Sequence, residues 1–218
     1  MTAAGLAFRV EDPLSYLPRS TVIERARGQL IYGATELGAE IFLVLSGKVT
    51  VTRRTATDRR VLVDIYHTDE FFGENCILHA ERRGEEAMAL ELSRLMSWTS
   101  GEIEEAVLRR PRLGVALAQL MARRNTETAL RVESLAVEKI EQRLARALLR
   151  FSDKFGETSG DGSVRLFPLT HELLAEYVGT SREIVTHYMT GLRRRGSIRY
   201  SRKGIDVYSG ALREWLAA

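Results

Sequence analysis

The segment from Gly179 to Gly196 carries four side chains that can form directional hydrogen bonds and that share one face of a short helix. These side chains are Arg182, Glu183, Thr186 and His187. Arginine can donate two parallel hydrogen bonds to guanine O6 and N7, and glutamate can accept one from cytosine N4. A helix that presents such groups near its N-terminus can read base edges in the major groove of DNA. The four residues are therefore candidates for base contacts.

Two capped helices joined by a glycine turn would position these side chains. Thr170 is a candidate N-cap of HELLAEYV, Gly179 can end that helix in a left-handed conformation, and Thr180 with Glu183 fits a capping box for the next helix. Such a pair is typical of a helix-turn-helix. Five side chains of the second helix can face inward: Ile184, Val185, Tyr188, Met189 and Leu192. SIRYSRKGIDVYS then predicts a β-hairpin wing around Lys203 and Gly204.

Hydroxyl and basic side chains in the same region are candidates for contacts with the DNA backbone. They are Thr170, Thr180, Ser181, Arg193 and Lys203. The charge distribution agrees, because residues 138–218 hold 14 Lys and Arg against 10 Asp and Glu, whereas the other 137 residues hold 18 against 19. The positive charge of the chain therefore lies in its C-terminal third, which favours a polyanionic partner there.

The N-terminal half has a different pattern of apolar and polar residues. Residues 20–100 alternate apolar and polar positions in short runs, such as EIFLVLSGKVTVTRR around Ser46 and Gly47, and predict an antiparallel sandwich or roll. In the next run, RRVLVDIYHTDEFFGE, we expect Val61, Val63 and Ile65 on one face. Helices follow, with Ser100 as the N-cap of the first and Pro111 at the start of a helix that reaches about Ala136. VEKIEQRLARALLRFSDKFG is a further amphipathic helix.

One stripe of the long helix is apolar at first and charged later. Its members are Leu113, Leu117, Leu120, Arg124, Glu127 and Arg131. A helix of about 40 Å with such a stripe needs a partner surface. We expect it to pair with its own copy in a dimer, and the alternative is docking along its own barrel.

From about Arg27 to Tyr208 the sequence resembles the Crp/Fnr superfamily of bacterial transcription regulators. The matching motifs are FFGE (Phe71–Glu74), LMARRNTETALRVESLA, and LTHELLAEYVGTSREIVTHYMTGLRRRGSI. The resemblance implies an α+β fold with a jelly-roll-like β-roll of the cyclic-nucleotide-binding type (1–110), a dimerisation helix (111–137) and a winged helix-turn-helix (138–218). It also implies a homodimeric transcription regulator on double-stranded DNA. The expected operator is two-fold symmetric, with half-sites about 34 Å apart, and RNA polymerase is a further expected partner.

The resemblance also assigns roles on the second helix. Arg182 and Glu183 match the base-reading pair of the family's cAMP receptor protein. His187 stands where that protein has a second base-reading arginine, and a neutral histidine donates one hydrogen bond instead of a bidentate pair.

The effector region departs from the cAMP-binding pattern. Gly73 and Glu74 match it, and Thr128 matches an adenine-contacting threonine, but Glu85 and Glu86 fall at the positions of an Arg-Ser pair. Two carboxylates would repel a cyclic phosphate. These five residues are the predicted effector pocket, and we expect cAMP not to bind unless Arg82 and Arg83 substitute. The alternative is a sensor of the same fold that is active only with bound cAMP or haem.

Other functions find less support in the sequence. Cys76 and His79 could ligate haem, and Cys76 could sense redox state, but the favoured interpretation is a buried free cysteine and a solvated histidine. A single cysteine excludes a disulfide framework and a Cys-rich metal site within the chain. No GxSxG, P-loop or HExxH motif and no apolar run of membrane-spanning length is present. We expect no catalysis, no metal and no cofactor, a cytoplasmic location, and no membrane partner. A module that acts through protein contacts alone would lack salt-dependent DNA affinity.

Overall fold

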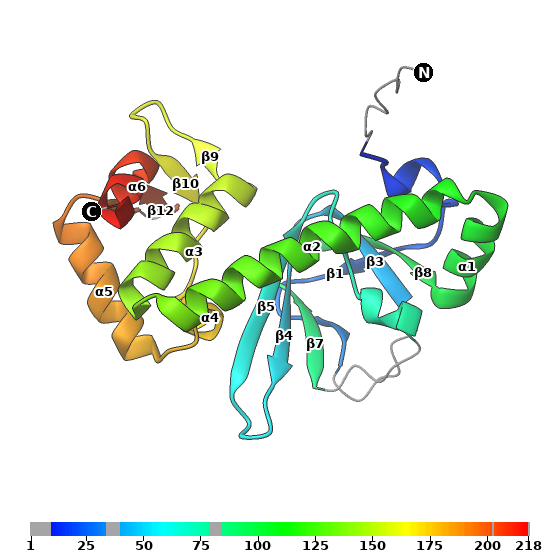
Figure 1. Ribbon diagram of the computed structural model, residues 1–218, viewed down its shortest axis with the longest axis horizontal. Helices are drawn as coiled ribbons and strands as arrows, with labels where there is room; N and C mark the ends of the chain where they lie inside the picture. The colour runs from blue at the N-terminus through cyan, green and yellow to red at the C-terminus, as the bar shows by residue number, and fades with distance from the viewer. Residues whose placement is uncertain (1–9, 34–39, 79–83, 202, 218) are drawn as a thin grey trace, which may run out of the picture.

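The N-terminal part of the chain is a roll of two antiparallel sheets (Figure 1). The structure is a computed structural model and describes residues 10–33, 40–78, 84–201 and 203–217. Within these residues, one four-stranded sheet has the order β1 (Val22–Arg25), β8 (Ser93–Thr99), β3 (Glu40–Ser46) and β6 (Phe71–Phe72). The other has the order β2 (Leu30–Tyr32), β7 (Glu85–Ala89), β4 (Lys48–Arg54) and β5 (Arg60–His67). The predicted antiparallel β-roll is confirmed.

Aromatic side chains fill the space between the two sheets. Tyr32, Phe42, Phe72 and Tyr66 stack in sequence, with ring centroids 5.1 to 6.1 Å apart. Such stacked rings contribute beyond the area that they bury. Gly47 turns the chain between β3 and β4 with a φ of 89°, and a Cβ there would lie 2.6 Å from the Leu92 carbonyl oxygen. The predicted Ser46-Gly47 turn therefore requires glycine at position 47.

A β-bulge changes which side chains of β5 face the roll. The pairing of β4 with β5 shifts register between Val51 and Thr52, whose partners are Asp64 and Leu62. Leu62 and Ile65 consequently face outward and join the C-terminal core, whereas Val63 packs against the interior of the roll. The prediction that Val63 and Ile65 share a face is wrong because a bulge interrupts the period of two.

A cap and a long helix follow the roll. Thr99, and not Ser100, is the N-cap of α1 (Ser100–Arg109), because Thr99 Oγ1 accepts from the Glu102 amide and Glu102 Oε2 accepts from the Thr99 amide. The long helix is α2 (Arg112–Val137), close to its predicted bounds. Of two 3₁₀ turns, η1 (Pro13–Ser15) contacts α2 and η2 (Glu74–Leu78) contacts β3. Within the described residues, no helix is both long and apolar enough to cross a membrane.

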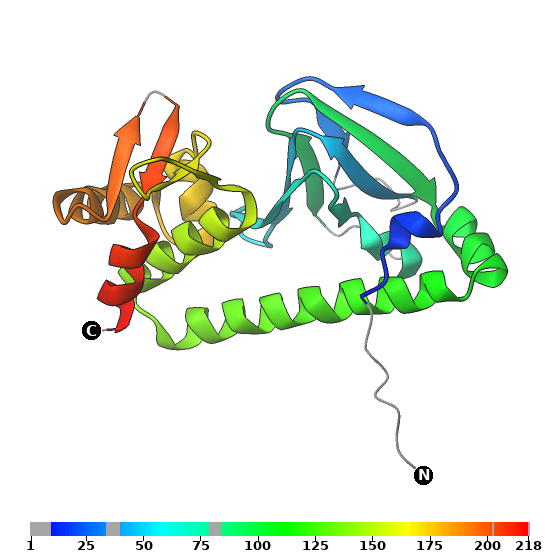
Figure 2. The ribbon, with the colours of Figure 1, turned by 90° about the horizontal axis from the view of Figure 1, so that it is seen from above.

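The mixed stripe of α2 docks along the roll of its own chain. Leu113 and Leu117 are buried in a cluster with Ile41 and Trp98. Farther along the stripe, Arg124 and Arg131 donate hydrogen bonds to main-chain carbonyls of the roll. The stripe thus docks along its own barrel, which is the alternative given above, and does not form the expected dimer contact. A second copy would have to pack against another face of α2. Figure 2 shows α2 running beside the roll to the C-terminal elements.

The C-terminal elements form a second core. They are α3 (Ile140–Phe155), β9 (Glu157–Thr158), β10 (Val164–Leu166), α4 (His171–Val178), α5 (Arg182–Arg194), β11 (Ile198–Ser201), β12 (Gly204–Val207) and α6 (Ser209–Ala217). The strands form an antiparallel sheet in the order β11-β12-β10-β9. The apolar face of α3 is buried as predicted, and it packs with the inner sides of α4 and α5. This is the predicted winged helix-turn-helix.

Candidate nucleic-acid interface

The turn between α4 and α5 is built around one left-handed glycine. Gly179 has φ 78° and ψ 45°, and the amides of Gly179 and Thr180 both donate to the Ala175 carbonyl, at 2.9 and 3.1 Å. Ser181 is the N-cap of α5, and its Oγ accepts from the Ile184 amide at 3.4 Å. The predicted capping box of Thr180 and Glu183 is wrong by one residue, because the Thr180 amide already closes α4.

The outer face of α5 presents most of the predicted base-reading side chains. Arg182, Glu183 and His187 are exposed near the helix N-terminus, whereas Val185, Met189 and Leu192 are buried beneath them. Figure 1 shows α5 at the end of the molecule remote from the roll, so the roll leaves this face uncovered. Ile184 was expected to face inward but is 38% exposed, which adds an apolar group to the outer face.

Glu183 is held in its ionised form. A backbone amide and the Ser181 hydroxyl stabilise the carboxylate and lower its pKa below the ordinary value. An ionised carboxylate is a pure acceptor, as a contact with the cytosine amino group requires. The free amides in the first turn of α5 add positive potential at the same end.

Thr186 takes part in a hydrogen-bonded chain that the sequence did not reveal. Its hydroxyl donates to the Arg182 carbonyl at 2.8 Å and lies 2.8 Å from His171 Nδ1. Since the hydroxyl hydrogen is used, His171 Nδ1–H is the donor to Thr186, and Nε2 accepts from the Tyr200 hydroxyl at 2.8 Å. The chain joins the start of α4, the middle of α5 and the wing.

This chain changes the roles available to its members. Thr186 is committed as donor and acceptor, so it acts first as a support of α5. Burial, together with the nearby Arg182 charge, lowers the pKa of His171 and favours the neutral ring that the tautomer requires. His171 and Tyr200 are 29 residues apart, and no local sequence pattern couples them.

The predicted backbone contacts surround the same end of the molecule. Thr170 caps α4 by accepting from the Leu173 amide at 3.1 Å, which leaves its hydroxyl hydrogen available to a phosphate. Ser181, Arg193 and Lys203 are exposed, with Lys203 in the turn between β11 and β12. Thr180 is half-buried and its amide is used, so its side chain alone remains available.

The predicted effector residues lie in two different settings. Inside the roll, Glu85 is buried and accepts from the Tyr32 hydroxyl at 2.8 Å and from Asn75 Nδ2 at 3.2 Å. Glu74 forms an ion pair with Arg124 of α2. Gly73 has a φ of 83°, and a Cβ there would lie 2.9 Å from the Glu40 carbonyl, so the turn needs glycine.

The other two effector candidates point elsewhere. Glu86 lies 3.6 Å from Arg54 Nε, and Thr128 is exposed on α2. A large cavity of about 670 Å³ lies beside the C-terminal half of α2, and none of the five predicted effector residues lines it. Arg82 and Arg83 lie outside the described residues. The effector pocket stays a prediction.

Cys76 is fully buried in the apolar cluster that contains Phe71 and Trp98. A haem iron would have to open this cluster to reach the sulfur, and His79 lies outside the described residues. In the described part of the chain, no group of three His, Cys, Asp or Glu side chains is arranged to hold a metal ion. The expectation of a chain without cofactor stays a prediction.

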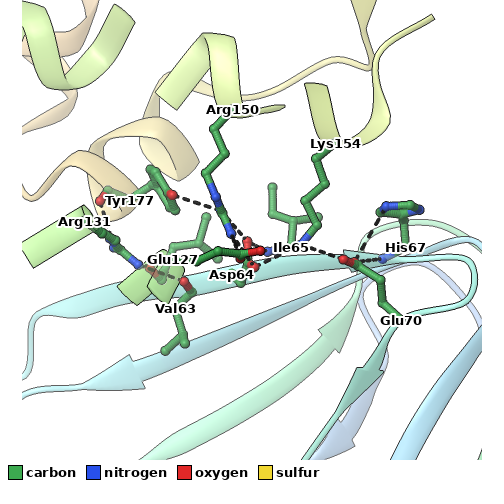
Figure 3. A network of polar contacts seen from close by, with 11 residues as sticks. Val63, Asp64, Ile65, His67, Glu70, Glu127, Arg131, Arg150, Lys154 and Tyr177 are labelled. Atoms are coloured by element: carbon green, nitrogen blue, oxygen red, sulfur yellow. Dashed lines mark hydrogen bonds and ion pairs between the residues drawn. The ribbon is translucent and has the colours of Figure 1, made fainter. Parts of the chain in front are cut away.

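An ionic network links the C-terminal elements to the roll (Figure 3). This network was not predicted from the sequence. The buried Asp64 carboxylate of β5 accepts from Arg150 Nη1 and Nη2 at 2.9 and 3.0 Å, and from Lys154 Nζ at 2.9 Å. Burial alone would raise the pKa of Asp64, but Arg150 and Lys154 of α3 hold it at about 2. Arg131 of α2 donates to the carbonyls of Leu62, Val63 and Tyr177 at 2.7 to 2.8 Å, which ties three elements together.

Comparison with known proteins gives the same division of the chain. Residues 22–110 match the cyclic nucleotide-binding domain, and residues 142–209 match the Crp-like helix-turn-helix domain. The chain is 30% identical to the cyclic AMP receptor protein of Thermus thermophilus over 208 residues, which cover 95% of this chain and 92% of that one. It is 29% identical to a CRP-like cAMP-activated global transcriptional regulator of Mycobacterium tuberculosis, over 85% of this chain and 83% of the relative.

A solved structure supports the assignment of the fold. A transcriptional regulator from Thermus thermophilus, described as a CRP/FNR family member, superposes with a TM-score of 0.74 at 27% identity. The superposition covers 91% of this chain and 99% of that protein. Similarity therefore extends through the roll, α2 and the winged helix-turn-helix together.

Proposed function

Since the chain belongs to the CRP/FNR family of transcriptional regulators and is a DNA-binding regulator, we propose that it binds a two-fold symmetric operator as a homodimer. The N-terminal end of α5 enters the major groove. The observation that carries this proposal is the joint exposure of Arg182, Glu183 and His187 on one capped end of α5, away from the roll. Arg182 and Glu183 then read one G·C pair, and His187 contributes one further hydrogen bond.

The exposed face of α2 is the surface that joins the two copies. Residues at alternating spacings of three and four are all exposed on the side opposite the docked stripe. They are Val115, Ala118, Ala122, Asn125, Ala129, Val132 and Ala136. Small and aliphatic side chains at heptad spacing allow two helices to approach closely, and a single asparagine at such a position fixes their register. Burial of this seam gives Val115 and Val132 the partner that they lack in one chain.

We propose that the protein binds DNA without cAMP. The relatives above carry names that refer to cAMP, but in this chain Glu85 occupies the roll interior and repels a cyclic phosphate. The alternative is an effector-dependent sensor of the same fold that becomes active with cAMP or haem. In either case the chain acts through binding and not through catalysis, with RNA polymerase as a partner and a cytoplasmic location.

Selection of random duplex DNA with the purified protein tests this proposal. Two selections run in parallel, one without added ligand and one with cAMP. We expect the ligand-free protein to enrich a two-fold symmetric site whose half-sites lie about one helical turn apart, since each α5 reads one half-site. The enriched sequence also reports which base His187 contacts.

Other outcomes would count against particular parts of the proposal. Enrichment with cAMP alone would overturn the ligand-free activity and favour the effector-dependent alternative. Enrichment of a single short motif without symmetry would overturn the homodimeric operator. Absence of salt-dependent DNA affinity under both conditions would contradict DNA binding itself.

A further inference from the structure

A cavity of about 670 Å³ lies where the two halves of the molecule meet, between the C-terminal half of α2 and the helices α3 and α4. Its volume lies in the range of small-molecule sites in proteins. Part of its wall is apolar and comes from Leu130, Leu135, Val137, Leu149 and Val178. Another part is the ionic network of Figure 3, through Arg131, Arg150 and Lys154. The cavity thus combines an apolar surface with fixed charges.

Most charges around the cavity are already neutralised by neighbours. Arg150 and Lys154 pair with Asp64, Lys154 also pairs with Glu70, and Arg150 also pairs with Glu127. The Arg146 guanidinium pairs with Glu138, and Arg213 lies 3.1 Å from Asp153. These groups therefore already have counter-charges within the protein and do not require a ligand to balance their charge.

Within the described residues, Arg143 of α3 and Glu133 of α2 are charged groups of the lining that form no ion pair. The Nε of Arg143 is buried without a hydrogen-bond partner in the described part of the chain. Arg131 is likewise bonded to carbonyls only, and burial lowers the pKa of its guanidinium. Arg143 thus lines the cavity without a carboxylate partner, and a ligand anion would supply its counter-charge.

We propose that this cavity is a binding site for a small organic anion with an apolar body. Its carboxylate, sulfonate or phosphate group accepts hydrogen bonds from Arg143, with Arg131 as the second cation, and its apolar body lies against the aliphatic wall. Arginine suits this role because its planar guanidinium can bind such groups in a bidentate manner. The site is separate from the predicted effector pocket, since none of the five residues of that pocket lines it.

The proposed dimer leaves this site accessible. From α2 the cavity is lined by seven residues: Glu127, Leu130, Arg131, Glu133, Ser134, Leu135 and Val137. Most of these side chains lie on the side of α2 away from Ala122, Ala129 and Ala136 of the exposed seam, whereas Glu133 lies at the edge of that seam. A second copy on the seam would therefore border the cavity at Glu133 and leave its other lining residues uncovered.

Fluorescence titration of the full-length protein with 8-anilinonaphthalene-1-sulfonate, in the absence of DNA, tests the proposal. This probe carries one sulfonate on an apolar aromatic body. We expect one saturable site per chain, at least tenfold weaker binding in Arg143→Gln, and unchanged binding in Arg109→Gln. Arg109 is an exposed arginine of α1 that pairs with Glu105 far from the cavity, so it controls for the loss of one charge. The uncharged analogue N-phenyl-1-naphthylamine should bind at least tenfold more weakly than the sulfonate.

A second variant keeps the test decisive if Arg143→Gln fails to fold. Ser134→Trp fills the cavity from α2 and leaves Arg143 in place, and we expect it to abolish saturable binding while far-UV circular dichroism stays unchanged. Equal affinity in wild type and a folded Ser134→Trp, equal loss in Arg109→Gln and Arg143→Gln, or equal binding of the uncharged analogue would each overturn the proposal. Since no DNA is present, the result does not depend on the proposed operator.

Discussion

At the scale of single residues, hydrogen-bond capacity determines which side chains of α5 remain available to DNA. Arg182 and His187 are exposed as the sequence predicts, whereas Thr186 is held by His171 and by the Arg182 carbonyl. Sequence spacing places the three on one face, but it cannot show that a histidine 15 residues earlier satisfies one of them. Fewer side chains of α5 are consequently available for base contacts than the sequence pattern predicts.

The neutral state of His171 makes stability depend on pH. Its pKa is lowered in the folded protein, so between that pKa and the ordinary value of about 6.5 the unfolded chain binds more protons. The free energy of unfolding should therefore fall as pH decreases from about 6.5. We expect His171→Gln to remove part of this decrease, as measured by urea denaturation at pH 7.5, 6.5 and 5.5.

A second histidine provides the matched control for this titration. His187 is exposed on α5. Within the described residues, its ring nitrogens form no side-chain hydrogen bonds like the two that hold the His171 ring. His187→Gln should retain the wild-type decrease in stability between pH 7.5 and 5.5. If His171→Gln and His187→Gln showed the same pH dependence as wild type, the assigned tautomer and its role would be wrong.

At the scale of elements, the stripe of α2 that the sequence assigned to a dimer contact docks on the roll instead, and the proposed dimer uses the opposite face. The stripe from Leu113 to Arg131 docks on the roll, where apolar side chains are buried and arginines reach carbonyls. The face from Val115 to Ala136 consists mostly of small residues, whose heptad pattern is less conspicuous than that of leucines. A stripe pattern shows that a helix has a partner, but it does not show whether the partner is the same chain.

A charge on the exposed seam should separate the proposed dimer. Val132 is 59% exposed in one chain and lies at the centre of the C-terminal part of the seam. Val132→Glu would bury two like charges across a symmetric interface, at a cost of about 1–3 kcal/mol for each unpaired group. We expect the dimer dissociation constant from sedimentation equilibrium to rise at least tenfold.

Leu108→Glu supplies the comparison for this substitution. Leu108 is 82% exposed on α1, so the same gain of charge occurs outside the seam. Its dissociation constant should match that of wild type. A dimer that tolerated Val132→Glu as well as Leu108→Glu would place the interface on a different surface.

The turns and one of the three N-caps follow the sequence prediction. Thr170, Gly179 and the hairpin at Lys203 and Gly204 lie where local chemistry places them, because each satisfies main-chain groups within a few residues. The N-caps at Thr99 and Ser181 each differ by one residue from the prediction, since neighbouring Ser and Thr compete for the same role. The bulge in β5 was not predictable, because it depends on the register of a paired strand.

At the scale of the whole molecule, the relation between the roll and the winged helix-turn-helix is fixed by buried ionic contacts. Asp64 and Arg150 are 86 residues apart, and nothing in either segment indicates the pairing. Charged residues in an amphipathic helix such as α3 are normally solvated, so nothing in the sequence distinguishes Arg150 and Lys154 from solvated side chains. Only the packing of β5 against α3 shows that these cations bind a carboxylate of the other half.

Removal of the Asp64 charge should destabilise the protein. Asp64→Asn leaves Arg150 and Lys154 with one fewer buried partner, and we expect a loss of about 3 kcal/mol, the lower end for breaking a buried pair. Because the folded pKa of about 2 lies below the unfolded value of 3.8, the contribution is complete above pH 4 and is lost as pH falls through about 2. Guanidinium denaturation at pH 7 and pH 3 measures both effects.

The exposed pair of Asp153 and Arg213 is the reference for this loss. Both side chains are more than half exposed, so Asp153→Asn should cost no more than about 1 kcal/mol at pH 7. Equal stability of Asp64→Asn and Asp153→Asn would mean that the network in Figure 3 does not hold the two halves together.

The affinity of Arg182→Ala for the selected operator tests the central claim most directly. We predict a loss of about 1–3 kcal/mol and a relaxed preference at the guanine position, with non-specific affinity retained. Arg193→Ala, at an exposed position that we predict to contact phosphate, should instead weaken specific and non-specific binding alike. Unchanged operator affinity and base preference in Arg182→Ala would contradict the placement of α5 in the major groove.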